Sequence, residues 1–131
     1  MNAFLLVAAA VLLSIGVMHT VVAEWKGERR LVWRVTRLTL FDSSDAKDLL
    51  AKRIVRLAWH LTSLIWCGCA VVFAYIAFVE ASGPIIVVVR ILASVFLLHS
   101  ALSLIIVRGR HASWLGFLIV SVLSFLGTML F

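Results

Sequence analysis

The chain has 131 residues, of which 64% are hydrophobic and 14% are charged, and its mean hydropathy is +1.16. A soluble domain has about 25% charged residues and about half apolar ones, so this composition excludes an ordinary water-soluble domain. The net charge of +6 would suggest nucleic acid in a soluble protein, but nine of the twelve basic residues lie between Glu24 and Arg56. This clustering beside apolar segments indicates membrane topology, and no nucleic-acid partner is expected.

The apolar segments predict an all-α fold, an integral membrane four-helix bundle with up-down topology. Only helices and closed barrels satisfy every backbone group in lipid, and no alternating strand pattern favours a barrel. One transmembrane domain over residues 1–131 is expected, with spans at about 3–23, 54–79, 85–107 and 112–131.

The first span is an apolar run of about 21 residues without a basic start, longer than the usual signal-peptide core of about 7–15 residues, so we interpret it as a retained span. Leu12, Gly16, His19 and Ala23 recur along it at helical spacing. Small residues let neighbouring helices approach closely, and this stripe is therefore expected to face the bundle.

The connection at residues 24–53 is polar and basic. Arg30, Arg34 and Arg37 recur at helical spacing among apolar residues, which is typical of a short amphipathic helix on anionic lipid headgroups. A solvated linker whose basic residues fix the orientation is the alternative. Residues 42–44 offer N-cap side chains, which predict a helix that begins near this point and continues into the second span.

Charge distribution predicts the orientation. The first and third connections are basic, and Arg108, Arg110 and His111 of the third are expected near lipid headgroups. The second connection carries only Glu80, so the positive-inside rule predicts cytoplasmic basic loops and both termini outside, in a multi-pass protein of the bacterial inner membrane. Arg90 lies close enough to the end of the third span to extend to the interface or to pair with Glu80.

Three histidines, His19, His60 and His99, lie on three different spans, in the predicted cytoplasmic half. Intramembrane ionisable residues are costly, so they mark candidate cofactor ligands. His19 and His60 match in depth and could hold a haem or other tetrapyrrole, or a metal ion. The structural alternative is that each histidine hydrogen-bonds a serine, threonine or carbonyl group of a neighbouring helix.

Other features narrow the chemistry. Trp59 falls near the predicted cytoplasmic interface, where indole rings collect, whereas Trp66 lies deeper and either packs in the core or lines a cofactor pocket. No HxxxH, HExxH or CxxC motif occurs. Since no catalytic triad or paired intramembrane carboxylates occur either, an enzyme is not the expected class.

Four spans with histidines on several of them resemble, in architecture, the four-helix cytochrome b561-type membrane proteins. That resemblance implies haem held by histidines of the bundle. The two-haem members need histidine pairs at both membrane faces, and this chain has none in the predicted outer half. At most one haem could be held, by His19 with His60 or by His60 with His99.

Two functions follow as expectations. The first is an accessory or scaffold subunit of a larger membrane complex, because the chain has short loops and stripes of small residues for lateral contacts with other subunits, with a second copy, or with lipids. The alternative is a redox protein that binds haem, another tetrapyrrole or a metal through the three histidines. A small transporter is a weaker third possibility, since no central glutamate marks a coupling site.

Overall fold

The computed structural model describes residues 1–24, 46–79, 82–109 and 112–131, and these residues are all-helical. The described helices are α1 (Ala3–Glu24), α3 (Ala46–Phe78), α4 (Gly83–Val107) and α5 (Ser113–Gly127). The predicted all-α class is therefore confirmed for this part of the chain.

Some predictions fall outside the described residues. These include the predicted amphipathic segment with Arg30, Arg34 and Arg37, and the headgroup candidates Arg110 and His111. Arg108 is described and is exposed at the end of α4.

Three of the described helices are long and apolar enough to cross a membrane, as expected of an integral membrane protein. Their candidate spans agree with the first three predicted ones to within a few residues, and they are Ala3–Val21, Arg53–Phe78 and Gly83–Ile106. α3 has 33 residues, so at 1.5 Å per residue it is about 50 Å long, more than the hydrocarbon thickness of about 30 Å. Its beginning at Ala46 agrees with the predicted helix start after residues 42–44.

The fourth predicted span, 112–131, is too long. α5 has 15 residues and ends at Gly127, which gives a length of about 22 Å. At this end, Asn2 Nδ2 donates to the Gly127 carbonyl oxygen at 2.8 Å, and the Thr128 hydroxyl donates to the Phe125 carbonyl oxygen at 2.7 Å. The backbone N–H groups of Thr128 and Leu130 donate to the same two carbonyl oxygens, so the last carbonyl groups of the helix are satisfied.

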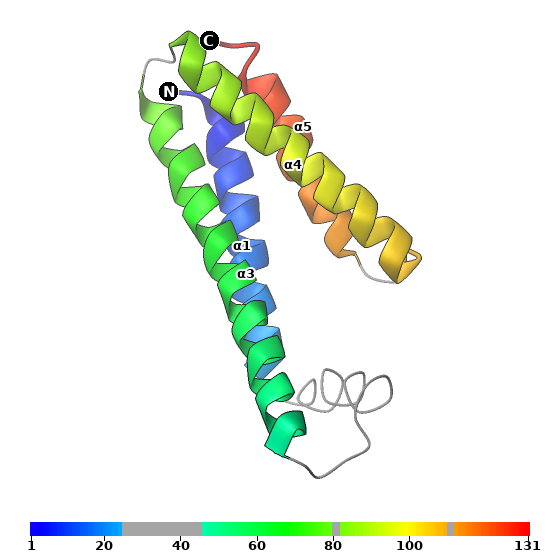
Figure 1. Ribbon diagram of the computed structural model, residues 1–131. Coiled ribbons are helices and arrows are strands. Elements are labelled where there is room, and N and C mark those ends of the chain that lie inside the picture. The colour runs from blue at the N-terminus through cyan, green and yellow to red at the C-terminus, as the bar shows by residue number, and fades with distance from the viewer. Residues whose placement is uncertain (25–45, 80–81, 110–111) are drawn as a thin grey trace.

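The helices form two hairpins that diverge from one end of the molecule, as Figure 1 shows. α1 packs along α3 and along α5, and α4 packs along α5, whereas the backbones of α3 and α4 approach each other at few positions. α1 is therefore the helix that joins the two hairpins. The result is a V-shaped arrangement in which α3 and α4 form the two outer arms.

The end of the molecule that carries both termini is held by hydrogen bonds; we call it the closed end and define it by Asn2, Ala77, Gly127 and Thr128. The Asn2 backbone N–H donates to the Ala77 carbonyl oxygen at 2.8 Å. The Asn2 side chain donates to Gly127 and also accepts from the Leu5 backbone N–H at 3.3 Å. One asparagine thus connects α1, α3 and α5.

Small residues allow α1 to approach both of its neighbours. A Cβ atom on Gly16 would lie 2.7 Å from Cys67 Sγ, and a Cβ atom on Gly127 would lie 3.0 Å from side-chain atoms of Leu5. The predicted inward position of Leu12 and Gly16 is confirmed, because both are buried. In lipid, such close van der Waals packing is a main source of helix association.

The opposite end, where α3 begins and α4 ends, is the open end. α4 stops there because Arg108 takes a left-handed conformation at φ 50° and Gly109 follows at φ 70°. The Gly109 backbone N–H returns to the Leu104 carbonyl oxygen at 3.1 Å, as in other left-handed helix C-caps.

Candidate functional site

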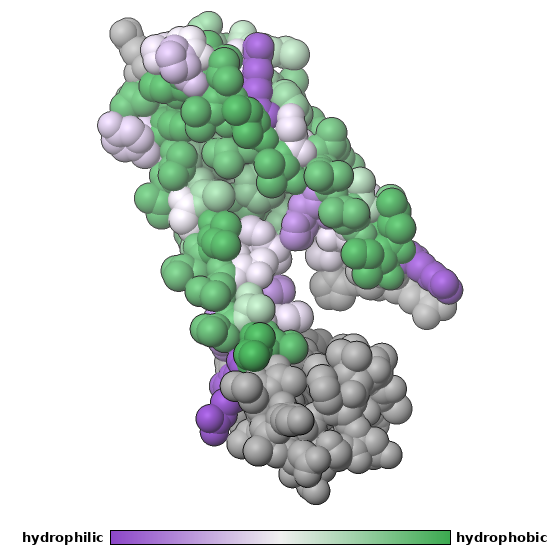
Figure 2. Space-filling model, in the orientation of Figure 1, coloured by the Kyte–Doolittle hydropathy of each residue, from purple (hydrophilic) through white to green (hydrophobic). Residues whose placement is uncertain are grey.

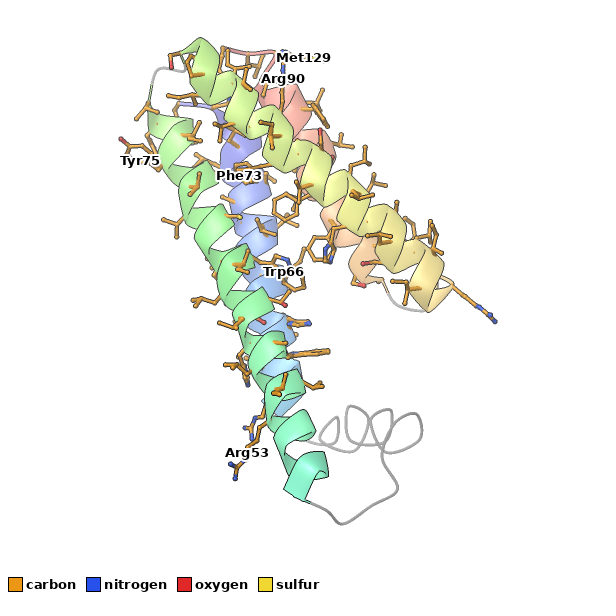
Figure 3. The ribbon with its side chains drawn as sticks, viewed as in Figure 1. Arg53, Trp66, Phe73, Tyr75, Arg90 and Met129 are labelled. Atoms are coloured by element: carbon orange, nitrogen blue, oxygen red, sulfur yellow. The ribbon has the colours of Figure 1, made fainter. Side chains whose placement is uncertain are left out.

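Trp66 lies where the two arms separate, and it is the residue on which all four described helices converge. Its side chain, labelled in Figure 3, projects from α3 toward the other hairpin and is 8% exposed. Its ring contacts one ring from each of the other helices, namely His19 of α1, His99 of α4 and Phe117 of α5. We call these residues, together with Trp59 and Ser63, the Trp66 cluster.

Two of the three predicted ligand histidines are brought together around this indole. The ring centroid of His19 lies 4.8 Å from that of Trp66, and the centroid of His99 lies 5.4 Å from it. Both pairs are edge-to-face, a favourable arrangement for aromatic rings. Both imidazoles therefore share Trp66 as a neighbour.

His19 is held on several sides by α3. Its ring stacks on Trp59 with centroids 3.9 Å apart and planes 6° from parallel. The Trp59 Nε1–H donates to the His19 carbonyl oxygen at 3.0 Å, and His19 Nδ1 lies 2.7 Å from Ser63 Oγ. The interhelical hydrogen bond to a serine is the structural role that the sequence offered as the alternative to ligand binding.

The contacts of Ser63 indicate which nitrogen of His19 carries the proton. Ser63 Oγ also lies 3.3 Å from the Trp59 carbonyl oxygen, and a hydroxyl has one hydrogen to donate. The two contacts are compatible when Ser63 donates to that carbonyl and accepts from an N–H at Nδ1 of His19.

His99 occupies the other side of the cluster. Its ring is half-buried and lies 4.2 Å, centroid to centroid, from that of Phe117. One residue further, the Ser100 hydroxyl donates to the Trp114 carbonyl oxygen at 2.7 Å, which fixes α4 against the beginning of α5. The position of His99 is therefore set by the α4–α5 hairpin.

The third histidine, His60, is half-buried on α3, one residue after Trp59. Consecutive residues project about 100° apart around a helix. His60 therefore projects from a different face of α3 than Trp59, which stacks on His19. Within the described residues, no group of three or more histidine, cysteine or acidic side chains could hold a metal ion.

A notch separates the two arms below the Trp66 cluster. In the space-filling view of Figure 2, pale and purple residues lie along the facing walls of the two arms, whereas most of the remaining coloured surface in this view is green, apart from purple and pale side chains toward the ends of the arms. The base of the notch is formed by Trp66, His99 and Phe117.

From the sequence, two roles were open for Trp66, packing in the core or lining a cofactor pocket, and nothing connected it to the other rings. The signal was present in the spacing of Trp59, Ser63 and Trp66, which recur at i, i+4 and i+7 and therefore share one helix face. Trp59 lies stacked on His19 between α1 and α3, in addition to any role near an interface.

The cluster offers two imidazoles, two indoles and one hydroxyl group, which can form hydrogen bonds, stack on flat rings or ligate a metal. No protein-family model, curated protein or solved structure matches the chain.

Proposed function

We propose that this protein is an accessory or scaffold subunit of a larger assembly in a bacterial inner membrane, and that it binds a transmembrane helix of a partner subunit in the notch. The observation that supports this proposal most is the sparse contact between α3 and α4. These two helices meet through the ring pairs Trp66–His99 and Phe73–Phe96. Toward the open end the two arms diverge (Figure 1), and this is where we place the partner helix.

The energetics of helix association in lipid favour this occupant over acyl chains. Apolar side chains gain little by leaving lipid for another apolar surface, so association depends on packing and on interhelical hydrogen bonds. Pale and purple residues line the notch, and a partner helix with serine, threonine or amide side chains on one face can form interhelical hydrogen bonds there that acyl chains cannot form.

The low burial of the candidate spans is consistent with a subunit. Only 28%, 33% and 22% of the most apolar windows of α1, α3 and α4 are buried within the chain. We propose further that the four helices of the chain form the up-down bundle expected from the sequence. In this proposal, the partner helix closes the bundle by filling the notch between the arms. The basic connections would face the cytoplasm and both termini the outside.

Site-specific photocrosslinking in membranes tests the proposal. Ser103 follows His99 by one turn on α4 and is half-buried on the notch side, whereas Ile105, at a similar depth, is 70% exposed on the opposite face. A photoreactive side chain at Ser103 should give one protein adduct of defined mass, and the same group at Ile105 should give lipid adducts only.

The adduct must also depend on the notch itself. Adding Trp66→Ala to the Ser103 probe should remove most of the adduct, because the base of the notch would lose its shape. Equal crosslinking from Ser103 and Ile105, or a protein that runs as a 14.5 kDa monomer with no adduct from either position, would show that the notch has no protein partner.

A second candidate function is binding of a tetrapyrrole or another flat aromatic cofactor. It is favoured by one observation, the convergence of His19 and His99 on Trp66. His19 and the half-buried His99 place imidazoles beside indole rings, and aromatic rings stack well on flat ligands. His60 is the third candidate ligand, as the sequence predicted.

An absorption spectrum separates the two functions. For the cofactor, we expect a Soret band in gently purified protein, and His99→Ala or His60→Ala should shift or remove it, depending on which is the ligand. A colourless protein that gains no band when haemin is added, with an unchanged helix signal, excludes the haem form.

A further inference from the structure

Among the described spans, the charged residue furthest from a span end is Arg90 of α4. Arg90 is not part of the Trp66 cluster. It lies on the outward face of α4, on the side of the molecule that carries the closed end, as Figure 3 shows. Its Nε–H donates to Thr128 Oγ1 at 3.3 Å. Thr128 in turn donates to the Phe125 carbonyl oxygen, so the threonine oxygen is oriented to accept from Arg90.

This hydrogen bond directs the guanidinium toward the closed end. Arg90 lies seven residues after Gly83 at the start of α4, or about 10 Å along the helix axis, and its long side chain extends back toward the end of α5. A guanidinium has five N–H groups, and Thr128 uses the one on Nε. The two terminal nitrogens have the fork geometry that binds a phosphate group in a bidentate manner.

A shallow apolar groove runs along α4 beside Arg90. It has a volume of about 410 Å³ and is lined by Val87, Arg90, Ile91, Ser94, Val95 and Leu98. Ser94 also lines the groove. Its hydroxyl donates to the Arg90 carbonyl oxygen at 2.9 Å, so this polar group is already satisfied. The surface is therefore concave, apolar and has a cation near one end.

The dimensions of the groove match one chain of a lipid. From Val87 to Leu98 the helix rises about 16 Å at 1.5 Å per residue, which is about half of a hydrocarbon core of about 30 Å. The groove therefore has about the length of one leaflet's hydrocarbon layer. It begins about 6 Å from Gly83 along the axis of α4, and Arg90 lies in its part nearer the closed end. An apolar chain that runs inward from a phosphate at the interface is the arrangement of a phospholipid in that leaflet.

We propose that this groove and Arg90 form a binding site for one anionic phospholipid, with an acyl chain in the groove and the headgroup phosphate on the guanidinium. The charge of Arg90 decides between possible occupants, since an apolar helix of a second copy supplies no negative charge to the guanidinium, whereas an anionic headgroup does. The site is separate from the notch, which lies on the other face of α4.

Photolabelling in vesicles tests the site. The probes are phosphatidylglycerol and phosphatidylcholine, each with a photoreactive group in the acyl chain, and the labelled residues are mapped by mass spectrometry. We expect labelling of residues 87–98 to be about fivefold stronger with phosphatidylglycerol, the preference expected for one arginine near an anionic headgroup.

Four variants make the result specific. Arg90→Gln should reduce the preference to about one, Arg90→Lys should keep part of it, and Ser94→Leu should reduce labelling by both lipids because it fills the groove. Arg53→Gln, at an exposed arginine near the open end, should leave the labelling of α4 unchanged.

Two outcomes overturn the site. The first is a preference for phosphatidylglycerol that persists in Arg90→Gln while the helix content is unchanged. The second is crosslinking between the α4 helices of two copies in place of lipid labelling, which would assign the groove to a homodimer.

Discussion

The two ends of this molecule are held together by different kinds of contact. At the closed end, short hydrogen bonds from Asn2 connect three helices, and small residues allow their backbones to approach. Toward the open end, α3 and α4 are bridged by the rings of the Trp66 cluster, and the backbones diverge. Backbone-directed hydrogen bonds fix one geometry, whereas ring contacts allow adjustment, so the open end is the side suited to receiving another molecule.

The largest expected effect is at the boundary between the two ends. Trp66→Ala removes an indole that contacts α1, α4 and α5, so we expect a loss of about 3–5 kcal/mol of unfolding free energy. SDS-induced unfolding followed by circular dichroism measures it. Tyr75→Ala is the control, because Tyr75 is 68% exposed on α3. Equal losses in the two variants would contradict the role of Trp66 in joining the hairpins.

The next prediction concerns the approach of α1 to α3. Gly16→Val would place a Cβ atom 2.7 Å from Cys67 Sγ and 3.1 Å from the Ser63 carbonyl oxygen. Because the backbone carbonyl cannot move away without shifting α3, we expect a cost of about 1–3 kcal/mol. Gly68→Val is the matched control, since a Cβ atom there meets no other atom within 4 Å. A stability of Gly16→Val equal to that of Gly68→Val would refute this packing.

The closed end can be weakened at one residue. Asn2→Ala removes the side-chain bonds to Gly127 and Leu5, and we expect a loss of about 1–2 kcal/mol, because buried polar partners are left unsatisfied. The same unfolding assay applies. Ser14→Ala serves as the control, since the Ser14 hydroxyl is exposed and bonds only within its own helix, to the Ala10 carbonyl oxygen. A smaller loss of unfolding free energy in Asn2→Ala than in Ser14→Ala would contradict the role of Asn2 in holding the closed end.

The smallest effect is expected inside the α1–α5 contact. Ser121 is 1% exposed and its hydroxyl has no hydrogen-bond partner among the described residues. Ser121→Ala should therefore be neutral or stabilising by less than about 1 kcal/mol, because it removes a buried unsatisfied group. Ser100→Ala, which loses the bond to Trp114, should instead destabilise by about 0.6 kcal/mol. Destabilisation by Ser121→Ala of the same size would indicate a partner for its hydroxyl.

Much of the helical architecture was predictable from the sequence, because hydropathy and helical spacing report on single helices. Three candidate spans agree with the apolar segments of the sequence. In α5 and at its C-cap, the buried residues Phe117, Ser121, Ser124 and Thr128 recur at helical spacing, so that face could also be recognised from the sequence. The angle between the hairpins was not predictable. It depends on which residues of different helices meet, and periodicity within one helix carries no such information.

The site was predictable only in part. Of the three predicted ligand histidines, His19 and His99 share Trp66 as a neighbour, and their role as ligands stays a prediction. Depth alone paired His19 with His60, and it carries no information on the stacking of His19 on Trp59 of α3. The contact of Asn2 with Gly127 was not predictable either, because these residues are far apart in the sequence.

The bond between Asn2 and Gly127 means that the first and last helices meet at their outer ends. A short peptide linker could therefore join the two termini, and the exposed turn at Arg108 and Gly109 offers a place to reopen the chain. The resulting circular permutant would run α5, α1, α3, α4 with every interhelical contact retained. Its new termini would lie at the other membrane face, where fused reporters could be attached beside the space between the arms.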